Sequence, residues 1–170
     1  MRKIRIEVLA VLMLVALSGG CASRIKVSMY RAAEIDSVDT WFIDFADAPG
    51  RYEQTIGTRT GGETRIINEG YAPVDLQLRE DFFFAIRDSY RFSVTRVRDE
   101  ADGFILLRPL HFTRGGYKSL HVFLADEDGE YMARIRVNNG GSRPIEMDNE
   151  KFAELCGAVV VKVLKNPYAY

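Results

Sequence analysis

The sequence predicts an α+β fold in which two helices pack on one face of a mostly antiparallel sheet. Several segments alternate between apolar and polar residues, the period-two pattern of strands, and two longer segments repeat apolar residues every three or four positions, as helices do. Their order is strands, helix, several strands, helix, which favours helices segregated to one face of an antiparallel sheet. A hydrophobic fraction of 47% and a charged fraction of 28% are typical of a folded globular protein.

The N-terminal half contains the first strand candidates. Segments 25–29 and 38–46 alternate, and a turn over 47–50 ends the second. Their apolar faces are Ile25, Val27 and Met29, then Trp41, Ile43 and Phe45. Segments 55–60 and 63–68 flank Gly61-Gly62, which predicts a hairpin with a two-residue loop. Because both arms are polar, an ordered loop is the alternative.

Two amphipathic segments predict the helices. Pro73 suits a first helical turn. The last helix is expected to begin near Asp148 or Asn149, either of which can cap it, and to stop before Asn166-Pro167. The apolar stripes are Val74, Leu78, Phe82, Ala85 and Ile86 in the first helix, and Phe152, Leu155, Cys156, Val159, Val160 and Val163 in the last. Because Phe82-Phe83-Phe84 is wider than one stripe, the first helix is expected to be covered on more than one side.

The remaining strands are predicted over 92–97, 104–112, 120–124 and 131–137. The last three form an antiparallel meander, with turns around Gly115-Gly116 and over 126–129. Pro109 has no backbone N–H to donate to a neighbouring strand, so it marks a bulge or an edge position.

The first twenty-one residues predict an export signal. Three basic residues precede an apolar run from Val8 to Leu17, and small residues then lead to Cys21. The apolar run is shorter than the roughly 20 residues that span a bilayer. The segment is therefore interpreted as a secretory signal, not as a membrane-spanning helix.

The cysteine that follows the small residues resembles the lipobox of bacterial lipoproteins. The resemblance implies that the signal is removed before Cys21, and that its thiol and new amine are acylated. Leu17 lies one place further from Cys21 than the usual leucine of that family, with Ser18 in its place, and Ala22 implies delivery to the outer membrane. An ordinary cleaved signal with an incidental cysteine is the alternative. The expected division is a signal peptide over 1–20, a lipidated tether over 21–24 and a single α+β domain over 25–170.

Net charge and cysteine content limit which binding partners and which disulfide bonds are expected. The signal holds three basic residues and one acidic residue, so its removal leaves 20 basic and 23 acidic residues, a net charge of about −3. This balance predicts no nucleic-acid partner and no polybasic patch for anionic lipid, so membrane contact is expected through the lipid on Cys21. Each buried acyl CH₂ contributes about 0.8 kcal/mol to such anchoring. With Cys21 acylated, Cys156 has no disulfide partner.

Common catalytic signatures are missing from the sequence. It contains no G-x-S-x-G, H-E-x-x-H, C-x-x-C or phosphate-loop motif. His111 and His121 are the only histidines, on neighbouring predicted strands, so a shared metal is the sharpest hypothesis. A two-residue loop at Gly115-Gly116 would pair His111 with Leu120 and place the imidazoles on opposite faces, whereas a three-residue loop would bring them opposite each other. We predict neither a metal nor another cofactor.

Four further candidates are weighed in the same way. The acidic residues around Gly129 predict a charged hairpin turn and not a calcium loop, because the segment lies between strands. Ser119 and His121 share a strand face but lack a third orienting group. Cys156 is interpreted as a core residue. The aromatic side chains predict a core, with an exposed groove for a partner protein or an acyl chain as the alternative; they are Trp41, Phe42, Phe45, Phe82, Phe83, Phe84, Phe92 and Phe104.

Short local motifs resemble a family of envelope proteins. Ile56-Gly57 precedes a Gly-rich polar loop, the first helix ends in Tyr90–Val94, and Ala101–Phe104 enters a strand. These features resemble small periplasm-facing lipoproteins, most closely the YajG-like ones and more distantly the lipoprotein partner of the lipopolysaccharide-assembly barrel.

Together with the export signal, these observations predict an outer-membrane lipoprotein that faces the periplasm. It is expected to act without catalysis, as an accessory or binding module for an envelope protein in assembly or transport. The alternatives are a structural subunit of a secretion or envelope complex and an enzyme acting on envelope polymers.

Overall fold

A six-stranded sheet organises the molecule. The computed structural model describes residues 25–57, 63–89, 92–111, 116–139 and 147–170. The strand order is β1 (Ile25–Met29), β8 (Tyr131–Asn138), β7 (Tyr117–Asp126), β6 (Gly103–His111), β2 (Thr40–Phe45) and β5 (Ser93–Thr95). The signal peptide and tether predicted over 1–24 lie outside the described residues.

The sheet is mostly antiparallel, as predicted. β1, β8, β7 and β6 pair antiparallel in turn, whereas β2 runs parallel to both β6 and β5. The parallel pairs follow from connectivity, because a long crossover that includes α3 (Pro73–Arg87) separates β2 from β5 and β6. β5 covers only three residues of the predicted 92–97 strand.

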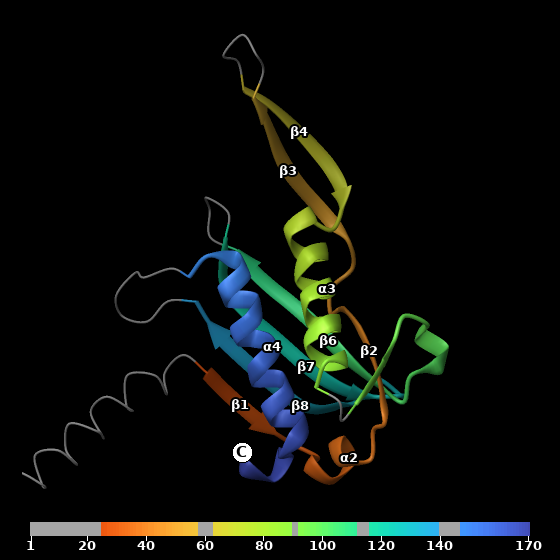
Figure 1. Ribbon diagram of the computed structural model, residues 1–170. Coiled ribbons are helices and arrows are strands. Elements are labelled where there is room, and N and C mark those ends of the chain that lie inside the picture. Colours follow the sequence, from red (N-terminus) through yellow and green to blue (C-terminus); the bar gives the residue numbers. More distant parts are fainter. Residues whose placement is uncertain (1–24, 58–62, 90–91, 112–115, 140–146) are drawn as a thin grey trace, which may run out of the picture.

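The helices lie on one face of the sheet. Figure 1 shows α3 and α4 (Asn149–Lys165) across the same face, with the short α2 (Ala32–Asp36) near one end of the strands. Pro73 is the first residue of α3, and the Asp148 side chain accepts a hydrogen bond from the Lys151 amide at the start of α4. Both predicted helix starts are thereby confirmed. The one-turn 3₁₀ helices η1 (Arg98–Glu100) and η2 (Pro167–Ala169) complete the described elements.

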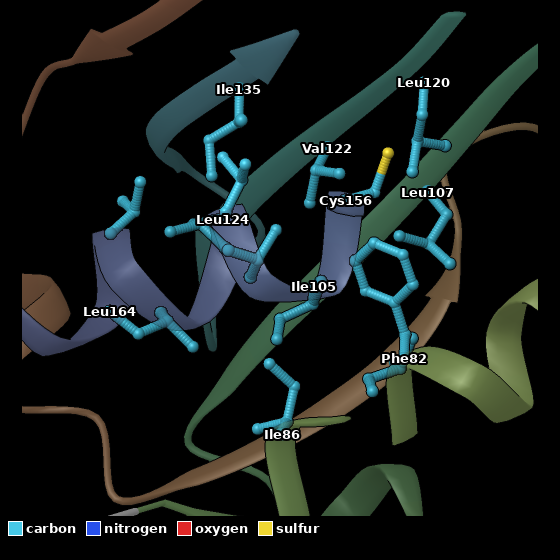
Figure 2. Close-up of a cluster of buried hydrophobic side chains, with 14 of the residues drawn as sticks. Phe82, Ile86, Ile105, Leu107, Leu120, Val122, Leu124, Ile135, Cys156 and Leu164 are labelled. Carbon is cyan, nitrogen blue, oxygen red and sulfur yellow. The ribbon is translucent and has the colours of Figure 1, made fainter. Parts of the chain in front are cut away.

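The core fills the space between these helices and the sheet. Its side chains come from both long helices and from β6, β7 and β8 (Figure 2), and the labelled ones, all fully buried, are Phe82, Ile86, Ile105, Leu107, Leu120, Val122, Leu124, Ile135, Cys156 and Leu164. A Cβ on Gly157 would lie 3.0 Å from the Ala85 Cβ, so this glycine lets α4 approach α3 closely. No helix within the described ranges is both long and apolar enough to cross a membrane.

A two-stranded hairpin projects away from the sheet (Figure 1). β3 (Gly50–Gly57) and β4 (Glu63–Gly70) pair antiparallel, so a hairpin forms here as predicted. Its register pairs Gly57 with Glu63, whereas a two-residue loop at Gly61-Gly62 would have paired Glu63 with Thr60. The predicted register is therefore wrong by three residues, because the sequences of the arms are polar and lack the apolar alternation that would define it.

Candidate functional site

One face of the six-stranded sheet carries its own distinct set of side chains. Residues paired across neighbouring strands share a face, and the rows that include Leu107, Val122 and Ile135 point into the core. The alternate rows point away from the helices. This open face consists of Lys26, Ser28, Phe42, Asp44, Phe104, Leu106, Arg108, His121, Phe123, Tyr131, Arg134 and Arg136.

Arginine side chains cover aromatic rings on the open face. Arg108 and Arg134 lie over the Phe123 ring at 5.2 and 5.6 Å from its centre, and Tyr131 stacks on the same ring at 4.9 Å. Arg98 covers Phe104 at 4.8 Å in the same way. Cation–π contact and the apolar stems of the arginines bury these rings, although α3 and α4 lie on the other face of the sheet.

The aromatic residues named in the sequence are divided between two environments. Trp41, Phe45 and Phe82 are buried in the core, as predicted. Phe42 and Phe104 meet edge-on at 6.3 Å on the opposite side of the sheet, so the core interpretation is wrong for this pair. Phe84 is 43% exposed, so the core interpretation is wrong for this ring too, whereas its neighbour Phe83 is partly buried against the core. Strand alternation places Phe42 away from its neighbours Trp41 and Ile43, which are buried in the core.

His121 lies at the centre of the open face and is 9% exposed. It pairs with Arg108 on one neighbouring strand and with Arg136 on the other, and its Nδ1 is 3.2 Å from the Arg134 guanidinium. Burial and then these three cations lower the pKa of His121. Because a guanidinium can only donate, Nδ1 accepts and the proton of the neutral ring is assigned to Nε2, which has no hydrogen-bond partner among the described residues.

A basic depression adjoins His121 at the edge of the sheet. Its walls are Lys26 and Ser28 of β1, Tyr30 just after β1, and Arg134 and Arg136 of β8. Its volume is about 130 Å³, and no acidic side chain lines it. Lys26, Arg134 and Arg136 are all exposed.

This gathering of positive charge contradicts the expectation drawn from net charge. The near-neutral balance predicted no polybasic patch, but neighbouring strands in register bring Lys26, Arg136, His121 and Arg108 into one row. Acidic residues gather elsewhere, in the walls of a different hollow. They are Glu34, Asp39, Asp102, Asp126, Glu127 and Asp128. A sum over the whole sequence cannot show such a separation.

His111 lies on the core side of the sheet, opposite His121. A bulge after Leu110 pairs His111 with Tyr117, and the two rings are 5.0 Å apart. The predicted pairing of His111 with Leu120 is wrong, because the strands meet in another register, although the predicted placement on opposite faces is confirmed. Part of the connecting loop, over 112–115, lies outside the described residues. The described residues contain no group of three or more His, Cys, Asp or Glu side chains that could hold a metal ion.

His111 is bound to Asp75, a residue that the sequence analysis missed. Asp75 is buried in the first turn of α3, and its carboxylate oxygens lie 3.0 and 3.3 Å from the His111 Nε2. The hydrogen bond to this carboxylate raises the pKa of His111. The only available signal was an acidic residue in the first helical turn, where it also favours the helix dipole.

Tyr117 completes this cluster and lines a groove between α3 and α4. Its hydroxyl donates to the Val74 carbonyl at 2.7 Å, and burial followed by the nearby Asp75 raises its pKa. The groove has a volume of about 360 Å³ and is lined by Val74, Gln77, Leu78, Asp81, Tyr117, Asn149, Glu150 and Ala153. The three polar side chains of the cluster, His111, Asp75 and Tyr117, link β6 and β7 to α3, which is a structural role.

The other predicted residues have ordinary surroundings. Ser119 is buried, and within the described ranges it forms no hydrogen bond with His121. Cys156 lies in the core, as predicted, and burial raises the pKa of its thiol. The charged turn is also confirmed: Arg31 binds the Asp126 carboxylate at 2.9 Å, and Gly129 has a φ of +84°. Cys21 lies outside the described residues.

Comparison with known proteins gives fold-level likenesses only. No family model and no curated protein matches the chain, so the YajG-like resemblance has no support from sequence comparison. A DUF4136 family protein from Bacteroides thetaiotaomicron is 8% identical, with 85% of this chain and 95% of that chain covered at a TM-score of 0.45. A PelC dodecamer from Paraburkholderia phytofirmans is 14% identical, with 82% of this chain and 94% of that chain covered at a TM-score of 0.40. Scores this low assign no function to the chain.

Proposed function

We propose that this protein is a lipid-anchored lipoprotein of the outer membrane that faces the periplasm and acts by binding. Its role is that of an accessory module in the assembly or transport of an envelope component. The signal sequence and Cys21 support the anchor. The observation that carries the binding role is the open face, where arginines and aromatic rings share a sheet surface away from the described helices.

The composition of this face fits protein recognition. Tyrosine, phenylalanine and arginine are enriched where proteins bind one another, and they supply a large share of the binding energy. Tyr131 is 45% exposed and stacked on Phe123, so it is held in place before a partner arrives. Arg108 and Arg134 flank the same ring and can reach carboxylates of a partner.

Site-specific cross-linking in cells tests this role. A photo-reactive amino acid in place of Tyr131 should give a discrete adduct with an envelope protein. The matched position is Glu154, which is also exposed but lies on α4, on the other side of the sheet. Equal adducts from both positions, or none from Tyr131, would count against recognition by the open face.

The hairpin favours a second candidate, a structural subunit of an envelope complex. Ile66 and Ile67 on β4 are 39% and 65% exposed, on an element that projects from the molecule (Figure 1). Exposed isoleucines on a projecting arm suit contact with a neighbouring subunit. Adducts from position 67 at multiples of the chain's own mass would support this candidate, and adducts with other proteins alone would exclude self-assembly through the arm.

A further inference from the structure

We propose that the depression between β1 and β8 binds the phosphate-bearing headgroup of an anionic phospholipid in the membrane that holds the lipid anchor. The inference rests on the proposed anchoring at Cys21 and assigns a second, non-covalent membrane contact to the folded domain. It concerns the edge of the open face, whereas protein recognition was assigned to its aromatic centre around Phe123, and Arg134 borders both.

The side chains that line the depression include hydrogen-bond donors and positive charges but no carboxylate. Lys26 supplies three N–H donors, and Arg134 and Arg136 supply planar forks that match phosphate oxygens. Ser28 and Tyr30 add hydroxyl groups to the wall. At about 130 Å³ the hollow is roughly ten times the 10–15 Å³ that one water molecule requires. It therefore has room for a phosphate group but not for a whole phospholipid.

Among the described residues, the cations of the depression have no carboxylate partners. Arg31, Arg96, Arg98 and Arg108 each lie within 4.0 Å of an Asp or Glu side chain. By contrast, none of Lys26, Arg134 and Arg136 forms such a pair with any described residue. Three adjacent positive charges without counter-charges favour an anion from solution or from a surface.

Neutral neighbours hold the two arginines in position. The Arg136 Nε donates to the Asn138 side chain at 3.0 Å, and an Arg134 terminal nitrogen lies 3.2 Å from the His121 Nδ1. These contacts use one N–H of each guanidinium and no carboxylate, so the remaining donors and the full charges stay available. Such prior ordering reduces the entropy lost when an anion binds.

The position of β1 selects a lipid headgroup as the occupant. Lys26 is five residues after Cys21, and five fully extended residues reach at most about 17 Å. With acyl chains on Cys21, this hollow must therefore lie near the membrane surface. Headgroup phosphates are the anions present there at high local concentration.

Protection of Lys26 from acetylation tests the proposal. The purified lipidated protein is reconstituted in vesicles of phosphatidylcholine alone or with one part in four of phosphatidylglycerol. Acetylation rates of Lys26 and Lys162 are then compared by mass spectrometry. Lys162 is the internal control, because it is exposed on α4. We expect phosphatidylglycerol to slow the reaction of Lys26 at least threefold relative to Lys162.

Two variants separate a built site from a general surface effect. Arg134→Gln with Arg136→Gln should abolish the protection, whereas Lys118→Gln with Lys151→Gln, which removes as much charge elsewhere, should preserve it. Undiminished protection in the arginine variant would overturn the proposal, as would equal protection by phosphatidylcholine alone. If the double arginine variant does not fold, Arg136→Gln alone serves, because it leaves Arg134 over the Phe123 ring.

Inorganic phosphate distinguishes the source of the anion. Millimolar phosphate added to phosphatidylcholine vesicles should leave Lys26 unprotected, and equal protection would replace the lipid assignment with a free-anion site. Loss of the anchor would appear separately, as release of the protein from both kinds of vesicle. Cross-links from Tyr131 without lipid-specific protection would overturn this inference alone.

Discussion

At the scale of single residues, the two histidines have opposite surroundings and opposite pKa shifts. His111 gains a carboxylate partner in Asp75, which raises its pKa, and a third of its side chain is exposed. His121 is buried among arginines, which lowers its pKa. Because an unfolded histidine titrates near 6.5, each shift links the free energy of unfolding to pH.

The signs of the two effects predict a stability maximum near pH 6.5. His111 stabilises the fold fully below about pH 6.5, and this contribution is lost as pH rises through its raised folded-state pKa. His121 must stay neutral in the fold, so its contribution is lost as pH falls below about 6.5. Urea unfolding between pH 5 and 8.5 measures the free energy of unfolding. In His111→Gln this free energy should no longer fall as pH rises above about 6.5, and in His121→Gln it should no longer fall as pH drops below about 6.5. Unchanged pH profiles in both variants would show that these neighbours do not control titration.

A second residue-scale prediction concerns the anchor. Cys21→Ser removes the thiol that would be acylated, so the protein should appear in the soluble periplasmic fraction or remain uncleaved. Fractionation and gel mobility measure this, and Cys156→Ser is the matched change, expected to leave membrane retention intact. Retention and mobility of Cys21→Ser equal to those of the parent would contradict the lipoprotein assignment.

At the scale of elements, α3 presents two unequal faces to its surroundings. Leu78, Phe82 and Ile86 are at most 1% exposed, at the spacing that places them on one side of the helix. Phe84 points outward, with Arg87 over its ring at 4.6 Å. The helix thus stabilises the fold mainly through one stripe.

Truncation of the two phenylalanines should separate these faces. Phe82→Ala removes a fully buried ring and should cost about 3–5 kcal/mol of unfolding free energy. Phe84→Ala loses an exposed ring together with its contacts with Arg87 and with the edge of Phe83, so the cost should be below about 1 kcal/mol. Denaturant unfolding of both variants measures the difference, and similar costs would refute the assigned helix face.

At the scale of the whole molecule, two parts differ in how they are stabilised. One is the six-stranded sheet with its helices, and the other is the β3–β4 hairpin. The six-stranded sheet shares one continuous core with the helices, whereas the hairpin pairs only within itself and projects outward (Figure 1). Isolated two-stranded hairpins are marginally stable in water. The molecule therefore combines a cooperative body with a weakly held arm.

Hydrogen exchange should reveal this difference in local stability. Backbone amides within the β3–β4 ladder are expected to exchange through local opening, faster than amides of β7, which require opening of the core. Deuterium uptake followed by mass spectrometry compares the two segments in one experiment. Equal protection would mean that the hairpin is stabilised by contacts beyond its own ladder.

Much of the architecture follows from local patterns in the sequence. Alternation at Trp41, Ile43 and Phe45 identifies the buried side of β2, because successive side chains in a strand point to opposite faces. Spacing of Leu78, Phe82 and Ile86 identifies the buried side of α3 in the same way. The fold class, the starts of both long helices and the burial of Cys156 were therefore predictable.

The sequence by itself determined most of the segments that form strands and both long helices, though not α2, and which of their faces are apolar, since these depend on residues close along the chain. Only the tertiary structure decided that β1 pairs with β8, that β2 runs parallel to β6, and how the strands around each turn are registered. The row joining Lys26 to Arg108 followed from that register, and the contact of Asp75 with His111 followed from the position of α3 beside β6. Strand pairing depends on contacts between residues distant along the chain, and no local pattern encodes which of them meet.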